Sequence, residues 1–459
     1  MENQQNAVKS GVAWTKFIIC SAIGVFVFFI NIRLPVWGGA PGATRNTIPI
    51  DHIHHFARYL VGPMASGRQQ IVALLIMVIG SILPFVLPIK EPFGKKMWNQ
   101  NNMQRIFTFF KILGAVAGFM HVLKLGPGFL HQGNFLPFLF NSLCVSLAFL
   151  IPLGGFFLYF LTNYGLMEFV GTYLQPVMRK IWRTPGRSAV DAVASFVGSY
   201  ALCMLITDKL YQEGKYTKRE AAIILTGFST VSVTFLVVVA NAYVIMDRWL
   251  FFFWSTFFVT YVVTAITARI YPLSKFPNEY YELATPVGEE PIKSDRFKVS
   301  IEGALNVAAA SGNVGKNMLN SFTAGCRMIT TILPTIMSIG LLGMIVAEFT
   351  PVFNIIGYIF FPFTFLIRLP EALLTAQALS TGIVEMFLPA AFFTAENSLQ
   401  ARFVAAVSGV SAVIFFSAVV PCMLSTKVPI KVSQLMIIWV QRLILSILLS
   451  GVIALIFLR

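Results

Sequence analysis

Long apolar stretches alternate with short polar ones along most of this chain. A helix needs about 20 apolar residues to cross a bilayer core of about 30 Å. Nine stretches meet this requirement, and we predict crossing helices at 17–34, 69–89, 106–123, 135–162, 221–246, 249–271, 322–347, 400–424 and 434–458. Two further apolar stretches, 188–209 and 371–393, lie between these spans and each carries a glycine near its middle.

The composition supports an all-α, polytopic helical membrane protein. Hydrophobic residues make up 57% of the chain, charged residues only 12%, and the mean hydropathy is +0.76. No water-soluble domain of this length needs so much apolar surface. The net charge of +15 comes from Lys and Arg between the apolar stretches, where they suit anionic lipid headgroups. We therefore expect the lipid bilayer, and not nucleic acid, as the partner of these charges.

Glycines and prolines recur at a nearly constant offset, which indicates an internal repeat. The offset is 186 at one end (357 − 171 = 186) and 182 at the other (409 − 227 = 182). The matching pairs are Gly154 and Gly340, Gly171 and Gly357, Pro176 and Pro362, Arg183 and Arg368, Pro185 and Pro370, Gly198 and Gly382, and Gly227 and Gly409. Because glycine and proline mark helix ends and turns, the two copies should share the same backbone bends.

The positive charges predict how the stretches 188–209 and 371–393 enter the membrane. Basic residues lie on both sides of 188–209: Arg179, Lys180, Arg183 and Arg187 before it, and Lys209, Lys215, Lys218 and Arg219 after it. Since Lys and Arg favour the cytoplasmic side, a re-entrant hairpin turning at Gly198 keeps both flanks inside. The second stretch is flanked only by Arg368 and Arg402, as expected for a hairpin that enters from outside.

The number of crossings predicts that the two copies are inverted. Each copy contributes three crossing helices and one hairpin, and an odd number of crossings reverses the direction of the second copy. We expect an uncleaved first span, a cytoplasmic N-terminus and a multi-pass protein of the bacterial inner membrane. The predicted parts are an N-terminal three-span region (1–134), a first repeat (135–271), a cytoplasmic linker with an amphipathic segment (272–321) and a second repeat (322–459).

Polar side chains on the hairpins and on the span that follows the first hairpin are the candidates for contacts with a solute. They are Ser188, Asp191, Ser195, Thr230, Asn241, Glu371, Gln377, Thr381 and Glu385. Several are spaced three or four residues apart and so share a helix face. An ionisable group at membrane depth is costly, so the three carboxylates should face the bundle interior or water. The alternative for the hydroxyls is hydrogen bonding to a neighbouring helix or to their own backbone.

The sequence was also searched for metal ligands, paired cysteines and catalytic residues. Asp51, His54 and His55 could bind a metal, but we expect an interfacial loop and no metal site there. Five cysteines are scattered singly, which fits small buried hydrophobes: Cys20, Cys144, Cys203, Cys326 and Cys422. No nucleophile is paired with a base, so we expect no enzymatic activity and no cofactor. A coupling ion, H⁺ or Na⁺, is left open.

One region resembles a known family. Gly171-x4-Pro176 with Arg183-x-Pro185, followed by Tyr211-x2-Gly214-x2-Thr217, is similar to the nucleoside-recognition "Gate" domain. Concentrative nucleoside transporters, the membrane part of the ferrous-iron transporter and bacterial spore maturation proteins share that domain. The overall plan, with two Gate copies after three extra spans, resembles bacterial YjiH-type membrane proteins. The resemblance covers roughly residues 140–430.

The resemblance implies a transporter of a small polar solute, nucleoside-like in kind, held between the two hairpin tips and moved by alternating access. The rival interpretation is a non-transporting Gate-domain subunit that scaffolds a complex with a membrane partner or with further copies of itself. A solvent-accessible cavity at the hairpin tips favours the transporter, and a tightly packed centre favours the scaffold.

Overall fold

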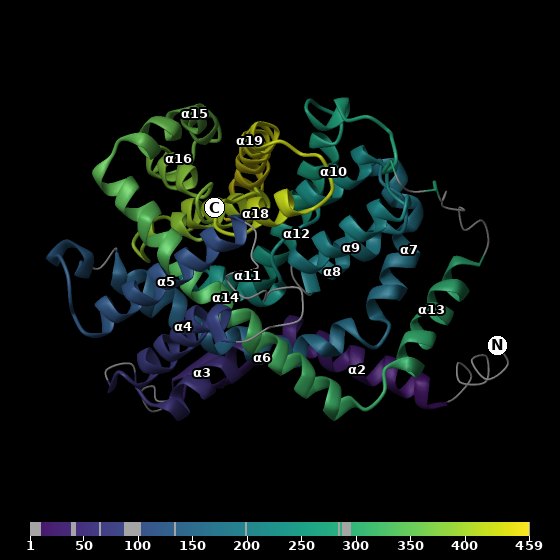
Figure 1. Cartoon of the computed structure of the whole chain (residues 1–459), viewed down its shortest axis with the longest axis horizontal. Coiled ribbons are helices and arrows are strands. Elements are labelled where there is room, and N and C mark those ends of the chain that lie inside the picture. The colour runs from purple at the N-terminus through teal and green to yellow at the C-terminus, as the bar shows by residue number, and fades with distance from the viewer. Residues whose placement is uncertain are drawn as a thin grey trace.

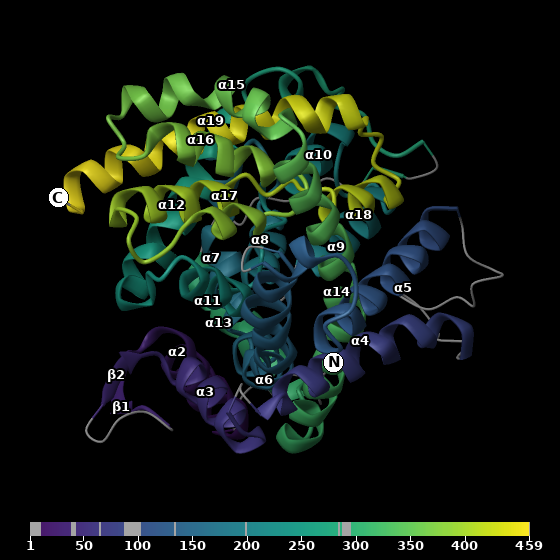
Figure 2. The same cartoon turned by 90° about the vertical axis from the view of Figure 1, so that its left-hand side faces the viewer.

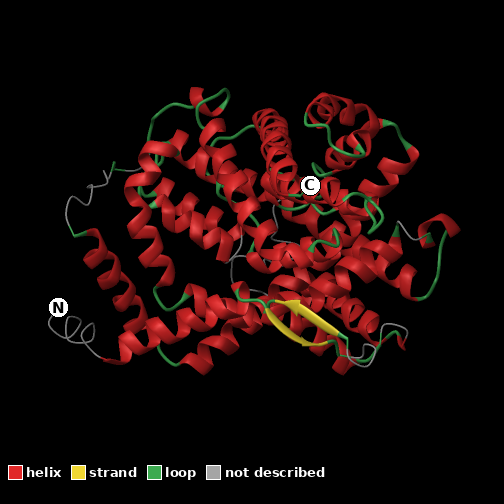
Figure 3. Cartoon of the chain, turned by 180° about the vertical axis from the view of Figure 1, so that it is seen from behind, coloured by secondary structure: helices red, strands yellow, loops and turns green. Residues whose placement is uncertain are grey.

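The computed structural model describes residues 11–37, 43–63, 66–86, 102–132, 135–197, 200–282, 285–286 and 295–458. Within these residues the chain is almost wholly helical (Figures 1 and 3). The one sheet is a ribbon of two antiparallel strands, β1 (Ile32–Pro35) and β2 (Thr44–Thr47). The fold class predicted from the hydrophobic pattern is therefore confirmed.

The α-helices are α2 (Gly11–Phe29), α3 (Pro49–Val61), α4 (Arg68–Val86), α5 (Asn102–Val122), α6 (Val145–Thr162), α7 (Leu166–Ile181), α8 (Ser188–Val197), α9 (Tyr200–Gln212), α10 (Lys218–Gly227), α11 (Val233–Ala242), α12 (Trp249–Thr267), α13 (Arg296–Ala310), α14 (Val314–Phe349), α15 (Val352–Leu366), α16 (Ala372–Thr381), α17 (Leu399–Ser411), α18 (Val419–Ser425) and α19 (Val432–Phe457). The short helices are η3 (Gly128–His131), η4 (Phe138–Cys144), η5 (Met246–Arg248), η6 (Leu273–Lys275) and η7 (Leu388–Phe392).

Six helical stretches in the described part of the chain are long and apolar enough to cross a membrane. They are Gly11–Phe29, Arg68–Phe85, Phe138–Leu161, Met246–Thr267, Val314–Phe349 and Val432–Phe457. Each matches a predicted span, so the protein is a multi-pass membrane protein. The predicted span 106–123 corresponds to α5, whose apolar part, Thr108–Val122, is shorter.

The other two predicted spans, 221–246 and 400–424, are wrong as continuous helices. The first is divided into α10 and α11, and the second into α17 and α18. In the first break, residues 228–232, the Ser232 hydroxyl accepts a hydrogen bond from Phe235 N (3.3 Å) and starts α11 as its N-cap. Serine and threonine favour such breaks because their side chains offer backbone groups an alternative partner.

The second break, residues 412–418, is held by another segment of the chain. Phe416 N donates to Ile383 O (2.8 Å) and Ser417 N donates to Val384 O (2.9 Å). These bonds replace the helical hydrogen bonds that the break loses. Hydropathy measures only the length of an apolar stretch, so it did not detect either break.

The order of the elements repeats along the chain. A long helix, a second helix, a hairpin, a broken helix and a final long helix occur first from α6 to α12 and again from α14 to α19. The starts of corresponding helices are separated by 186 residues at α7 and α15 (352 − 166), by 184 at α8 and α16 (372 − 188) and by 183 at α12 and α19 (432 − 249). The helices therefore follow the offset of the glycines and prolines. The four-part division of the chain stays a prediction.

The two ends of the first hairpin, α8–α9, lie at one end of the broken helix α10–α11. Ahead of α8, Ile181 O accepts from Arg269 Nη1 (2.5 Å), at the end of α12. Late in α9, Asp208 Oδ1 accepts from Lys427 N (2.7 Å). Lys218, which starts α10, belongs to the same face, because its N donates to Glu279 O (2.8 Å) beyond the end of α12. We call residues 180–187, 208–219, 269–279 and 427–431 the basic face. The predicted turn at Gly198 lies outside the described residues.

The second hairpin, α16–η7, opens at the other end of α10–α11. Its own two ends are joined, because the Ser398 hydroxyl donates to Glu371 Oε2 (3.0 Å). Next to them, Arg402 Nη1 donates to Val244 O (2.7 Å), just after α11 ends. The two hairpins thus enter the bundle from opposite ends, as the distribution of charge predicts.

The N-terminal region packs against the first helix of each repeat. Helices α4 and α5 pack on α14, and α2 and α3 pack on α6. Figure 2 shows the ribbon, α2 and α3 at the lower edge, with α15, α16, α17 and α19 gathered at the top. The interfacial loop predicted around Asp51, His54 and His55 is instead the helix α3, which follows β2.

Candidate substrate site

The first hairpin docks on the break between α10 and α11. The Ser195 hydroxyl on α8 donates to Thr230 O (2.8 Å) and lies 3.4 Å from Thr230 Oγ1. From α9, Cys203 Sγ lies 3.6 Å from the Ser229 hydroxyl. Ser195 and Thr230 are buried. Unwound backbone and hydroxyl groups therefore face each other inside the bundle, where a polar solute could exchange hydrogen bonds with them.

The second hairpin docks on the break between α17 and α18 in a similar way. The Ser417 hydroxyl donates to Glu385 Oε2, in addition to the backbone bonds of Phe416 and Ser417. Glu385 is 2% exposed, so this carboxylate lies in the interior without a cation beside it in the described structure. The sequence prediction that Glu385 faces the bundle interior is confirmed by this burial.

The two docking regions are neighbours. Helix α9 of the first hairpin packs beside α18, and the Tyr200 ring lies 6.2 Å from the Phe415 ring in the second break. On the other side, Phe235 of α11 lies 6.4 Å from Phe387 of the second hairpin. Polar groups of both hairpins are thus gathered in one central region, bordered by aromatic rings.

Asp191 and Ser188 lie at the start of α8. Asp191 is 1% exposed, and its Oδ2 accepts from the Tyr216 hydroxyl (2.7 Å). Its Oδ1 has no hydrogen-bond partner among the described residues. A carboxylate in the first turn is favoured by the helix dipole. The Ser188 hydroxyl, in contrast, donates to Pro185 O (2.6 Å) and shapes the turn that precedes the helix.

The remaining candidates lie elsewhere or have another partner. Glu371 is exposed and bonds Ser398 at the start of α17. Gln377 packs tightly against Gly357 of α15, where an added Cβ would meet its Cγ at 2.8 Å. The Thr381 hydroxyl donates to Ala378 O (2.7 Å) in its own helix, as the alternative for hydroxyls anticipated. Asn241 ends α11 and bonds the N-terminal region, as described below.

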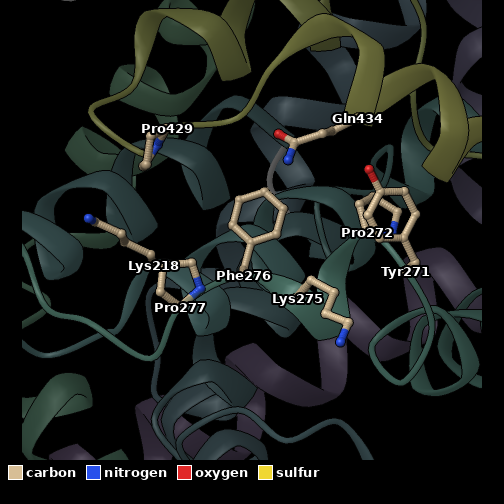
Figure 4. Close-up of a pocket in the computed structure, with 8 residues that line it drawn as sticks. All are labelled: Lys218, Tyr271, Pro272, Lys275, Phe276, Pro277, Pro429 and Gln434. Atoms are coloured by element: carbon tan, nitrogen blue, oxygen red, sulfur yellow. The ribbon is translucent and has the colours of Figure 1, made fainter.

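A small pocket lies on the basic face and apart from these residues. It has a volume of about 220 Å³ and is lined by Lys218, Tyr271, Pro272, Lys275, Phe276, Pro277, Pro429 and Gln434 (Figure 4). The amines of its two lysines point away from each other and from the central Phe276 ring. No predicted site residue lines it, so we do not assign the solute to this pocket.

Arg442 is a functional candidate that the sequence analysis missed. It is fully buried in α19, where Nη2 donates to Ser411 O (2.8 Å), Nε to Ala412 O (3.2 Å) and Nη1 to Thr264 Oγ1 (3.0 Å). It thereby caps the carbonyl end of α17 at the second break. The available signal was a single arginine inside the apolar stretch 434–458, since charges at membrane depth are rarely incidental.

Replacing Arg442 with methionine should destabilise the protein by about 3 kcal/mol or more, because buried carbonyls at the end of α17 would lose their donors. The measurement is the thermal unfolding temperature of the purified protein in detergent. Arg327→Met, at an exposed position of α14, is the matched control. Equal unfolding temperatures for the two variants would contradict the capping role.

Comparison with known proteins identifies the family to which this chain belongs. Residues 144–246 match the family described as nucleoside recognition (Gate), inside the predicted first repeat. The uncharacterized protein BpOF4_10220 of Alkalihalophilus pseudofirmus is 33% identical over 447 residues, which cover 94% of this chain and 92% of that protein.

Solved structures of CNTnw variants are similar at low identity. One in an intermediate 1 state has a TM-score of 0.44 at 13% identity and covers 96% of this chain and 98% of its own. Another, in an intermediate 3 state, has a TM-score of 0.41 at 13% identity and covers 96% of this chain and 99% of its own. The chain belongs to the same family as the A. pseudofirmus protein and carries the predicted nucleoside-recognition Gate domain.

Proposed function

We propose that this protein transports a small polar solute, nucleoside-like in kind, across the bacterial inner membrane by alternating access. The observation that carries the proposal is the docking of each hairpin on a break in a helix. Broken helices are tolerated at membrane depth where their free backbone groups face protein or a water-filled cavity. Paired hairpins and broken helices are the elements from which many carriers build a central site.

In this proposal, Asp191, Ser195, Thr230 and Glu385 contact the solute or a coupling ion. All four are buried, so the structure corresponds to a state in which the centre is closed. Access from either side requires one hairpin to move away from its break. The hydrogen bonds from Ser195 to Thr230 and from Ser417 to Glu385 would then open. The other predicted contacts stay predictions: Ser188, Asn241, Glu371, Gln377 and Thr381.

The test is uptake by proteoliposomes that contain the purified protein. A panel of labelled nucleosides, amino acids and organic acids is offered under an imposed H⁺ gradient or Na⁺ gradient, with protein-free liposomes as the control. We expect accumulation of one chemical class above the control. The gradient that drives it identifies the coupling ion.

A scaffold that transports nothing is the second candidate, favoured by the close packing of the centre. It predicts no uptake from the panel under either gradient. It also predicts a stoichiometric membrane partner that copurifies from native membranes. The two candidates are therefore separated by the same preparation of protein.

The basic face should be cytoplasmic. In a background with Cys326→Ser and Cys422→Ser, we expect Glu213→Cys to react with a membrane-impermeant maleimide only after cells are permeabilised. Glu396→Cys, beside the ends of the second hairpin, should react in intact cells. Both positions are exposed. Labelling of both from the same side would contradict opposite insertion of the hairpins.

A further inference from the structure

The side chains of Asp51, His54 and His55 lie close together on α3, and Asp51 Oδ1 accepts a hydrogen bond from Asn241 Nδ2 (3.3 Å), one of the predicted solute contacts. One ligand atom each of Asp51, His54 and His55 lies within 4.8 Å of the others. Asp51 and His55 are one helical turn apart, with 3.7 Å between Oδ1 and Nε2. The sequence predicted a loop without fixed ligand geometry here. The structure corrects this, because Pro49 starts a helix that holds the three side chains together.

The cluster already faces a cation. The guanidinium of Arg45 on β2 lies 3.0 Å from Asp51 Oδ2 and in close contact with His55 Nε2. Its Nη2 also donates to Asn241 Oδ1 (2.8 Å), at the end of α11. A carboxylate and an imidazole lone pair therefore point toward one positive centre. Arg45 and His55 are 30% and 33% exposed, so an ion can reach this side of the cluster.

His54 is the second observation that points to a ligand. It is 3% exposed, its ring lies beside the Ser146 backbone, and neither ring nitrogen makes a well-formed hydrogen bond with the described residues. A buried imidazole nitrogen without a full partner is unfavourable, and a metal ion would satisfy one of the two. Burial lowers the pKa of His54 well below its ordinary value and also lowers the pKa of His55. A neutral imidazole is the form that binds metals.

We propose that Asp51, His54 and His55 bind a divalent transition metal of the Zn²⁺ type, and that Arg45 is the competing cation which leaves when the metal enters. Two imidazoles and one carboxylate suit Zn²⁺, Co²⁺ or Ni²⁺. Mg²⁺ and Ca²⁺ prefer oxygen ligands and should not compete with these metals for the site. Departure of Arg45 also frees Asn241 Oδ1, so the metal would loosen the link between the β-ribbon and α11.

The experiment uses the tag-free full-length protein in detergent micelles. Zn²⁺ binding is measured by titration calorimetry, and Co²⁺ binding by its visible absorption. We expect one ion per chain and an unfolding temperature that rises with Zn²⁺ but not with Mg²⁺. His54→Gln, His55→Gln and Asp51→Asn should each weaken binding at least tenfold. His131→Gln, outside the cluster, should leave it unchanged.

Arg45→Gln separates the proposed site from nonspecific binding of metal by histidines. Removal of the competing guanidinium should tighten Zn²⁺ binding at least tenfold, whereas removal of a merely structural arginine should leave it equal or weaker. The proposal is overturned if His54→Gln and His55→Gln bind Zn²⁺ like the unaltered protein. Unchanged or weaker binding by Arg45→Gln also overturns it. Should a histidine variant fail to fold, the Arg45→Gln titration decides alone.

Discussion

Replacement of Glu385 by alanine should reduce solute uptake at least a hundredfold, with the folded protein still present in the membrane. Glu385 is the buried carboxylate of the second hairpin, held by the Ser417 hydroxyl at the break of α17–α18. Whether it contacts the solute or carries the coupling ion, no other described carboxylate replaces it at this hairpin. Loss of a charged partner at membrane depth has a large energetic effect. Uptake by proteoliposomes is the measurement.

Two further variants make the result specific. Glu396→Gln alters an exposed carboxylate beside the ends of the same hairpin and should transport normally. Ser417→Ala should retain partial uptake, because Glu385 remains but loses its hydroxyl donor. Size-exclusion profiles and unfolding temperatures must show folded protein for each. Uptake by Glu385→Ala at the level of the unaltered protein would remove the assignment.

Larger residues at Gly80 and Gly114 should prevent stable folding. An ideal Cβ at Gly80 would lie 1.7 Å from Thr330 O, and one at Gly114 would lie 1.7 Å from Pro334 O. Both oxygens belong to the backbone of α14, which cannot shift as a side chain can. Pro334 has no N–H for Thr330 O, and this leaves that carbonyl open to the close approach of α4. Small residues permit such contacts between membrane helices.

We expect Gly80→Leu or Gly114→Leu to yield little monodisperse protein, and the alanine variants to lose about 3 kcal/mol of stability or more. Gly303→Ala is the control, since nothing lies within 4 Å of an added Cβ at that helical position in α13. Alanine there should leave stability unchanged or raise it by up to about 1 kcal/mol. Unfolding temperatures of the leucine variants equal to that of the unaltered protein would contradict the packing of α4 and α5 on α14.

The class of protein and its repeat could be predicted from the sequence because their causes are local. A bilayer requires long apolar stretches, and six of the predicted spans appear as long helices. Glycine and proline limit the backbone wherever they occur, so the offset between Gly171 and Gly357 anticipated the repeated order of elements. The difference in charge between the flanks of 188–209 and those of 371–393 likewise predicted that the two hairpins enter from opposite ends.

The breaks in α10–α11 and α17–α18 could not be predicted in this way. A buried helix can break only where another segment provides new partners for its backbone groups. In the second break, Phe416 N donates to the carbonyl of Ile383, which belongs to the second hairpin. The capping role of Arg442 depends on the packing of α19 against the end of α17, which the sequence does not show. Asn241, predicted as a solute contact, accepts a hydrogen bond from Arg45, which is 196 residues away in the chain.

Apolar stretches, glycine spacing and flanking charges in the sequence thus determined the membrane fold, its internal repeat and the predicted entry of the hairpins. The tertiary structure decided which polar groups meet, because a hydrogen bond or an ion pair depends on the distance between two atoms. Glu385 with Ser417 and Arg45 with Asp51 are pairs of that kind. Neither pair can be read from the spacing of residues along the chain.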